Sequence, residues 1–268
     1  MGRREVENRW QYAVRSETNQ RENNEDSFQI LQLIPHLGED PITVLVVGDG
    51  MGGHAHGEDV SREALRKFST AFFEQVSVEP CLNKLSCSKQ LNLTRVAEAL
   101  KSAIAQTNNY VQRMVKNNLW GVAGSTIVIA AICGNKAIVA NLGDSPLFHY
   151  RQGKLKQVTE DHTVATVLVR AGIITPEMAL HHEGRNQLDY FLGCEELPEI
   201  KPILLKLEPE DLLLLCSDGA IGSLEPDKIA AILAGDNLEV IAEKLIRRSR
   251  DTGEKDNQTL ILWRHRNS

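Results

Sequence analysis

The sequence predicts an α+β fold in which antiparallel strands pair as hairpins and amphipathic helices pack against them. Residues 42–48 (ITVLVVG) form a short apolar run rich in β-branched residues, which is typical of a strand buried on both faces. Residues 124–157 contain further strand-like segments separated by turn residues. Two longer stretches, 58–76 and 94–117, repeat apolar residues at the spacing of a helix packed on a core.

In the N-terminal half, a first strand is expected at residues 27–34 (SFQILQLI), and the Asp-Gly pair after residue 48 is expected to end the second. The helix that begins at Glu58 has its apolar face at Val60, Ala64, Leu65, Phe68, Phe72 and Val76. A less regular connection, about residues 77–93, leads to the second helix, whose start Thr94 can cap. The apolar face of that helix consists of Val96, Leu100, Ala103, Ile104, Val111 and Val115.

In the second half, residues 124–145 predict two strands joined by a Gly-Asn pair, which tolerates the positive φ of a tight hairpin. The segment 146–159 (PLFHYRQGKLKQVT) is expected to continue the same meander through another glycine turn. Residues 161–195 break this rhythm with short helical pieces and polar residues, which indicates a surface subdomain. The remaining elements are expected as strands at 202–207, 212–216 and 258–263 and as helices at 225–234 and 238–250.

The composition is that of an ordinary globular protein, with 42% hydrophobic and 25% charged residues among 268. No proline-rich linker or internal repeat divides the chain, so residues 1–268 are expected to form a single domain. The net charge of −6 argues against a nucleic-acid-binding surface over the whole protein. Five scattered cysteines without CxxC spacing, a polar N-terminus and the absence of a long apolar run favour a cytoplasmic protein that does not enter a membrane.

Four aspartates lie at the ends of predicted strands: Asp49, Asp144, Asp218 and Asp256. An Asp-Gly pair after a strand is most often only a turn, but its recurrence, together with Glu25-Asp26 before another strand, favours a shared site. If these strands are neighbours, their carboxylates converge and repel one another unless cations neutralise them. Ligation by oxygen alone points to Mg²⁺ or Mn²⁺ rather than zinc.

Five motifs follow the order and approximate spacing found in the metal-dependent Ser/Thr protein phosphatases, the PPM or type 2C family: RENNEDS (21–27), VVGDGMGGHAHG (46–57), NLGDS (141–145), LCSDG (215–219) and EKDNQTLI (254–261). The chain resembles this family from about Ser16 to Trp263, and GDGMGG resembles its bacterial branch. The resemblance implies a four-layer α-β-β-α sandwich of two antiparallel sheets flanked by helices, with its core at about 16–263 and a flap subdomain at about 161–195. It also implies a two-metal centre at one end.

The resemblance further implies ligands for two core ions, Mn²⁺ or Mg²⁺. Asp49 would bridge both ions, and the backbone carbonyl of Gly50 would bind one of them. Asp218 and Asp256 would complete the shell of the first ion.

The second ion would be served by Glu25 or Asp26, directly or through water, and the sequence leaves both alternatives open. Asp144 with Asp218 matches the pair that holds a third, weaker ion in family members. The family usually has GDSR where this chain has GDSP, so Pro146 removes a charged side chain and a backbone donor two residues after Asp144.

The implied activity is hydrolysis of phosphoserine and phosphothreonine by direct attack of a metal-bridging hydroxide, with phosphorylated proteins as substrates and a cognate Ser/Thr kinase in the same pathway. Arg21 stands where the family places its phosphate clamp, and its planar guanidinium can donate two parallel hydrogen bonds to a phosphate. Arg21, Asp49 and Asp218 are therefore the expected catalytic residues. Met51 replaces a histidine that protonates the leaving group in some members, and Arg185 in the flap is a candidate substrate contact.

Two other functions remain open at this point. Some proteins of this fold lose their metal ligands and act as non-catalytic binding modules, but retention of the core carboxylates and Arg21 argues against that role here. A metal-dependent hydrolase of small phosphate esters is the other alternative. His54 and His56 are interpreted as solvated loop residues, because no further Cys or His stands at zinc-ligand spacing.

Overall fold

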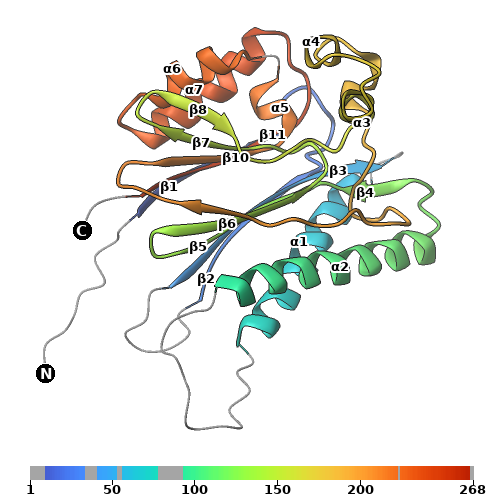
Figure 1. Ribbon diagram of the computed structural model, residues 1–268. Coiled ribbons are helices and arrows are strands. Elements are labelled where there is room, and N and C mark those ends of the chain that lie inside the picture. Colours follow the sequence, from blue (N-terminus) through green and yellow to red (C-terminus); the bar gives the residue numbers. More distant parts are fainter. Residues whose placement is uncertain (1–9, 34–40, 53–55, 78–92, 223, 266–268) are drawn as a thin grey trace, which may run out of the picture.

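The computed structural model describes residues 10–33, 41–52, 56–77, 93–222 and 224–265. Over these ranges the chain forms two antiparallel β-sheets stacked face to face, with helices on both outer faces (Figure 1). The predicted four-layer α-β-β-α sandwich is therefore confirmed.

The first sheet has the strand order β1-β11-β10-β7-β8. Its strands are β1 (Trp10–Glu17), β11 (Gln258–His265), β10 (Leu212–Cys216), β7 (Leu147–Arg151) and β8 (Lys154–Gln157). The second sheet has the order β2-β3-β5-β6-β9, with β4 paired to β3. Its strands are β2 (Asp26–Leu33), β3 (Ile42–Gly52), β4 (Ala123–Ser125), β5 (Ile127–Cys133), β6 (Lys136–Leu142) and β9 (Ile203–Lys206).

Helices cover both sheets, as Figure 1 shows, with α1 and α2 below the second sheet and α6 and α7 above the first. These four helices are α1 (Gly57–Ser77), α2 (Leu93–Asn118), α6 (Pro226–Leu233) and α7 (Leu238–Asp251). Shorter helices are α3 (Val164–Arg170), α4 (Pro176–Ala179), the 3₁₀ helix η1 (Glu183–Asn186) and α5 (Asp218–Ile221). No helix within the described ranges is long and apolar enough to cross a membrane.

Alternation along β3 explains why its residues 44–47 are all apolar. Val44 and Val46 pack with Phe68 of α1 in one buried cluster. Leu45 and Val47 pack with Trp263 in another cluster, between the two sheets. Because successive side chains point to opposite faces, a strand with a helix layer on one side and a sheet on the other is buried on both faces, as predicted.

The expectation that the Asp-Gly pair ends the second strand is wrong. β3 continues to Gly52, because β4 lies beside it and pairs Gly50 with Ser125 and Gly52 with Ala123. Asp49 is therefore held within a hydrogen-bonded strand and does not sit in a free turn.

The hairpin of β7 and β8 turns at Gln152 and Gly153, both with positive φ, so the predicted glycine turn is confirmed. The expectation that it continues the same meander is wrong, because β7 pairs with β10 of the other sheet. The chain changes sheets directly after Asp144. There Pro146, which has no N–H to donate, accepts a hydrogen bond from Cys216 N to its carbonyl oxygen (3.2 Å).

Three smaller points concern the expected elements. The second helix begins at Leu93, so Thr94 lies in its first turn and is not its cap. β1 was not expected from the sequence, because an edge strand pairs on one side only and half of its residues are polar. Most of the predicted irregular connection at 77–93 lies outside the described residues.

Candidate metal centre

Two of the carboxylates that the sequence singles out face each other across neighbouring strands. The β2–β3 register places Asp26 directly opposite Asp49. Asp26 is 7% exposed, and Ser217, which follows β10 in the other sheet, donates from Oγ to Asp26 Oδ2 at 2.7 Å. This bond joins the two sheets at the end of the sandwich where Asp49 lies.

Three further carboxylates come to this end from other elements. Asp218 begins α5 directly after β10, Asp256 lies just before β11, and Asp144 lies just after β6. Their charges, and that of Asp26, all raise the pKa of Asp49. The predicted convergence of strand-end carboxylates is therefore what the structure shows, with Asp49 at its centre.

Burial and mutual repulsion raise the pKa values of these carboxyl groups. Burial is the main cause of the rise in the pKa of Asp26 to about 7. Burial, followed by the charge of Asp218, raises the pKa of Asp144 to about 8. The pKa values of Asp49 and Asp218 are also raised, first by burial and then by neighbouring aspartates. Such a cluster retains protons near neutral pH unless a cation offsets its charge.

The residues present fit a divalent cation. Asp26 Oδ1 is buried and has no hydrogen-bond partner within the described ranges, and an acceptor in that position requires a donor or a positive charge. The carboxylate and carbonyl oxygens here are the ligand type that Mg²⁺ and Mn²⁺ prefer. Among the residues described, no three Asp, Glu, His or Cys side chains form a ready metal-binding group.

Gly50 allows three backbone segments to meet beside the cluster. A Cβ at Gly50 would stand 2.2 Å from the carbonyl oxygen of Gly57 and 2.6 Å from that of Glu25. Gly50 N also donates to Glu25 O at 3.0 Å. Only glycine lets β3, the residue before β2 and the start of α1 approach this closely.

The Glu25 side chain lies against the start of α1. A Cβ at Gly57 would stand 2.6 Å from Glu25 Cδ. Burial raises the pKa of Glu25, although Arg21 and a hydrogen bond from Gly57 N–H act in the opposite direction. The backbone of Glu25 thus lies beside Gly50 and its side chain beside Gly57, while Asp26 lies opposite Asp49, so the choice between the two for the second ion stays open.

Asn257, which the sequence reasoning missed, fastens the N-terminal loop to the cluster. It is 4% exposed, its Oδ1 accepts from Glu25 N at 2.8 Å, and its Nδ2 donates to two carbonyls of the loop 18–25 at 2.9 Å each. Arg21 on the same loop donates from Nη2 to Asp256 Oδ2 at 2.7 Å. Asn257 directly follows Asp256 in the sequence, and this position could have identified it.

Asp161 is a further acidic residue that the sequence reasoning missed. Burial and the charge of Asp218 raise its pKa to about 6, although Gln157 donates to Asp161 Oδ1 at 2.7 Å. Its own charge in turn raises the pKa of Asp144. Asp161 comes after β8 as Asp144 comes after β6 and Asp218 after β10, and this pattern could have identified it.

The segment 161–195 contains the predicted short helical pieces and is fastened at both ends to the carboxylate end of the sandwich. His162 N donates to Gly143 O, and Gly143 N donates to His162 Nδ1, both at 3.1 Å. At the other end, Leu192 and Ser125 exchange backbone hydrogen bonds of 2.8 and 3.1 Å. The segment therefore borders the cluster.

Two other residues singled out in the sequence have partners other than the carboxylates, and a third lies outside the described residues. Arg185 is exposed, and its Nη1 donates to Leu180 O of its own segment at 3.1 Å. His56 stacks on Trp120 with ring centroids 4.6 Å apart. His54 lies outside the described residues.

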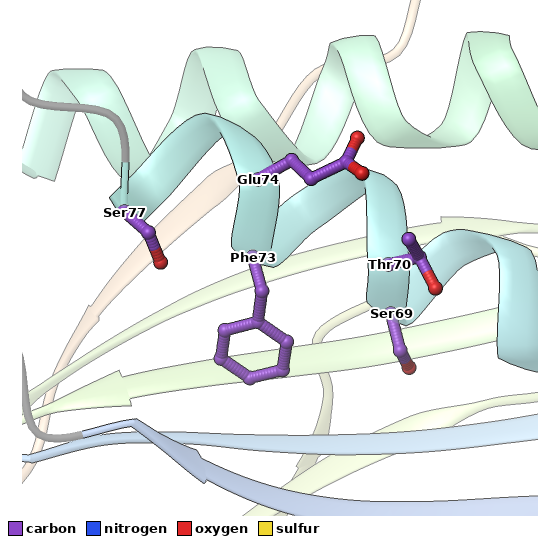
Figure 2. Close-up of a pocket in the computed structure, with 5 residues that line it drawn as sticks. All are labelled: Ser69, Thr70, Phe73, Glu74 and Ser77. Carbon is purple, nitrogen blue, oxygen red and sulfur yellow. The ribbon is translucent and has the colours of Figure 1, made fainter.

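A hollow of about 570 Å³ lies on α1, lined by Ser69, Thr70, Phe73, Glu74 and Ser77 (Figure 2). Figure 2 shows Phe73 and Ser69 projecting from the same side of the helix. Ser69 is about 18 Å along the helix from Gly57, at 1.5 Å per residue. With a single charged side chain among its lining residues, this hollow offers no comparable set of ligands.

The arrangement agrees with known proteins. A family model described as Protein phosphatase 2C matches residues 10–168, more than half of the chain. The chain belongs to the protein phosphatase 2C family. Membership confirms the predicted fold and the predicted class of enzyme, a metal-dependent protein serine/threonine phosphatase.

Individual phosphatases are similar over almost the whole chain. Serine/threonine phosphatase stp of Listeria welshimeri is 28% identical over 244 residues, which are 90% of each protein. The structure of the serine/threonine phosphatase PstP/Ppp of Mycobacterium tuberculosis is 27% identical with a TM-score of 0.74, covering 96% of this chain and 99% of that one. A PstP catalytic domain in complex with two manganese ions is also 27% identical, with a TM-score of 0.72 and the same coverage.

Proposed function

We propose that the carboxylate cluster is the active site of this phosphatase and that it acts on phosphoserine and phosphothreonine in phosphorylated proteins. One observation carries the proposal: four buried or half-buried aspartates raise the pKa of a fifth, Asp49, at one end of the sandwich. A site of crowded carboxylates with only oxygen donors is suited to divalent cations, and the family is metal-dependent.

Within the cluster, we assign the bridging position to Asp49, because the charges of four other aspartates all raise its pKa. The close backbone packing at Gly50 supports the assignment of its carbonyl oxygen as a further ligand. The full set proposed for two core ions is Glu25 or Asp26, Asp49, Gly50, Asp218 and Asp256.

The ions proposed are Mn²⁺ or Mg²⁺, supported by the all-oxygen donors and by the two manganese ions of the PstP complex. Asp144 with Asp218 is assigned to a third ion, and Asp161 adds a carboxylate beside that pair. Bound cations would make a water acidic enough to lose a proton near neutral pH and would offset charge on the phosphoryl oxygens. The chain's own carboxylates would place that chemistry at the end of the sandwich that the flap segment borders.

Arg21 is proposed to hold the phosphate of the substrate. Its side chain is 56% exposed and its partner Asp256 is 37% exposed, so their ion pair is weakly stabilising and can exchange for a phosphate. A guanidinium can make two parallel hydrogen bonds to phosphate oxygens. We also propose that residues 161–195 act as the flap and that Arg185 contacts the substrate there.

The wider setting follows from this activity. We propose one phosphatase domain over residues 1–268, a cognate Ser/Thr kinase that makes its substrates, and a cytoplasmic location. Within the described ranges, Cys194 and Cys216 form no disulfide, which supports a reducing compartment. Convergence of the core aspartates argues against a non-catalytic binding module, and the two named phosphatase relatives support protein substrates over small phosphate esters.

The purified protein is expected to hydrolyse p-nitrophenyl phosphate with Mn²⁺ and to lose this activity in EDTA, because the proposed site works only with bound cations. Initial rates on phosphoserine and phosphothreonine peptides should exceed those on nucleotides. Folded protein without metal-dependent turnover would exclude the enzyme, and a marked preference for nucleotides would exclude protein substrates.

Replacing Arg21 with alanine should raise KM for a phosphopeptide about tenfold or more, because charge-assisted hydrogen bonds to the phosphate are lost. The Mn²⁺ concentration for half-maximal activity should change less than the KM. The KM of Arg21→Lys, which keeps the charge but not the planar fork, should lie between the KM of the wild-type protein and that of Arg21→Ala. A larger change in metal requirement than in KM would show that Arg21 serves mainly to hold Asp256.

A further inference from the structure

Thr126 lies opposite Asp49, between two strands that both pair with β3. β4 ends at Ser125 and β5 begins at Ile127. Both strands follow the same register along β3, so the residue that faces Asp49 is Thr126. Thr126 is 2% exposed. It is therefore a buried neighbour of the aspartate at the centre of the cluster.

The hydrogen bonds between Thr126 and Asp49 differ from those of a regular antiparallel pair. Thr126 N donates to Asp49 O at 2.8 Å, as a paired residue does. The return bond runs from Asp49 N to the side-chain Oγ1 of Thr126 at 2.9 Å. The carbonyl oxygen of Thr126 accepts instead from Ser125 Oγ at 2.8 Å. The backbone of Asp49 is thus held by a side-chain hydroxyl.

The same side chain contacts the residues on both sides of Asp144. Thr126 Oγ1 and Ser145 Oγ form a hydrogen bond of 2.6 Å, and Ser145 is 1% exposed. On the other side of Asp144, a Cβ at Gly143 would stand 2.6 Å from Thr126 Cγ2. The hydroxyl of Thr126 therefore holds the residue after Asp144, and its methyl group packs against the residue before it.

The position of Thr126 in the sheet makes this double contact possible. β5 lies between β3 and β6, so its start stands between the strand that carries Asp49 and the strand that precedes Asp144. A hydroxyl can donate one hydrogen bond and accept others, so one threonine can bond to both segments. An unbroken backbone ladder would hold β3 and β5 together without this side chain. What the hydroxyl adds is the connection to Ser145.

We propose that Thr126 is a positioning residue that fixes Asp49 and Asp144 relative to each other for cation binding. The inference rests on the proposed metal centre, with Asp49 assigned to the core ions and Asp144 to the third. Ligand oxygens must lie within a narrow range of distances from a divalent cation, so residues that hold a ligand in place affect its affinity for the ion. Thr126 acts through these two aspartates and is not itself assigned to metal or phosphate.

Thr126→Val tests the proposal, because it removes the hydroxyl and keeps the shape and the methyl group. Its affinity for Mn²⁺ in a calorimetric titration should fall about tenfold or more, and kcat should fall by a similar factor with less change in KM. Thr126→Ser, which keeps the hydroxyl, should retain affinity within about threefold of the wild-type value. An affinity of Thr126→Val within about threefold of wild type, or an effect mainly on KM, would overturn the proposal.

A matched control and a measurement without metal separate positioning from general loosening. Thr107 is also fully buried, and its Oγ1 donates to Ala103 O within α2 at 2.7 Å, so Thr107→Val should leave Mn²⁺ affinity and kcat unchanged. In EDTA, the Asp49 amide of Thr126→Val should exchange its hydrogen about tenfold faster than in the wild-type protein. The amide of Val47, within the β3–β5 ladder, should not change. Faster exchange at both amides would indicate loosening of the sheet and would overturn the proposal.

Ser145→Ala separates the two connections, because it removes the bond to the segment of Asp144 and leaves Thr126 bonded to Asp49. Exchange of the Asp49 amide should stay within about twofold of wild type, while the weakest Mn²⁺-binding step should weaken about threefold or more. Unchanged Mn²⁺ binding in folded Ser145→Ala protein would overturn the proposal, even if Thr126→Val does not fold. Neither measurement requires turnover, so failure of this inference is distinct from failure of the phosphatase assignment.

Discussion

Replacing Asp49 with alanine is expected to lower kcat/KM about 1,000-fold or more, which corresponds to about 4 kcal/mol of transition-state stabilisation. Asp49 lies opposite Asp26, and the charges of three further aspartates also raise its pKa. It is therefore the carboxylate best placed to bind two cations. Phosphopeptide hydrolysis with Mn²⁺ measures the rate, and calorimetric titration with Mn²⁺ measures the accompanying loss of metal affinity.

The same substitution should raise the unfolding temperature of the metal-free protein, by about 3–6 °C, because it removes one of several repelling carboxylates. Asp236→Ala, at an exposed residue between α6 and α7, is the control and should change neither property. An Asp49→Ala protein that retains most of the wild-type rate would exclude the bridging role. One that loses both activity and fold would indicate a structural role instead, and Asp49→Asn would then be the decisive variant.

Without metal, the free energy of unfolding is expected to fall as pH rises from about 4 to about 8. The pKa is about 7 for folded Asp26 and about 8 for folded Asp144, whereas the ordinary value is 3.8. The folded state therefore binds more protons than the unfolded state over this range, so stability is fully present below pH 3.8 and is lost as pH passes through 7 and 8. The loss should be on the order of a few kcal/mol.

Urea unfolding in EDTA at intervals between pH 5 and pH 9 measures this dependence. Saturating Mg²⁺ should restore stability mainly at the alkaline end, because a cation binds the ionised carboxylates of the folded state. Asp26→Asn should remove part of the slope between pH 4 and pH 7, whereas Asp236→Asn should leave it unchanged. Stability that rises with pH in EDTA would show that these carboxylates are not repelling one another in the folded protein.

Much of the fold could be predicted because its signals are local. The helical spacing of Val60, Leu65 and Phe68 correctly predicted α1, and the continuous apolar run at 42–48 correctly predicted a strand covered on both faces. A helix face or a buried strand repeats its apolar residues within one or two turns or pleats, so a short window contains the whole signal.

What was missed depends on partners that are distant in sequence. β3 extends past Asp49 because β4 lies beside it, and the β7–β8 hairpin joins the other sheet because β10 offers it an open edge. Asn257 stands within the motif EKDNQTLI, but its role comes from the distant loop 18–25 that it holds. Hydrogen bonds across such separations leave no periodicity that a single sequence can display.

The candidate site divides in the same way. That acidic residues occur at strand ends, and that they suit a hard cation, follows from residue type and local pattern, and the five motifs were sufficient to recognise the family. That Asp26 faces Asp49 and that Asp161 joins the group follow only from the packing of the two sheets. The physical reason is that burial and charge repulsion depend on distances in space, which register and layer packing set and no local stretch of chain contains.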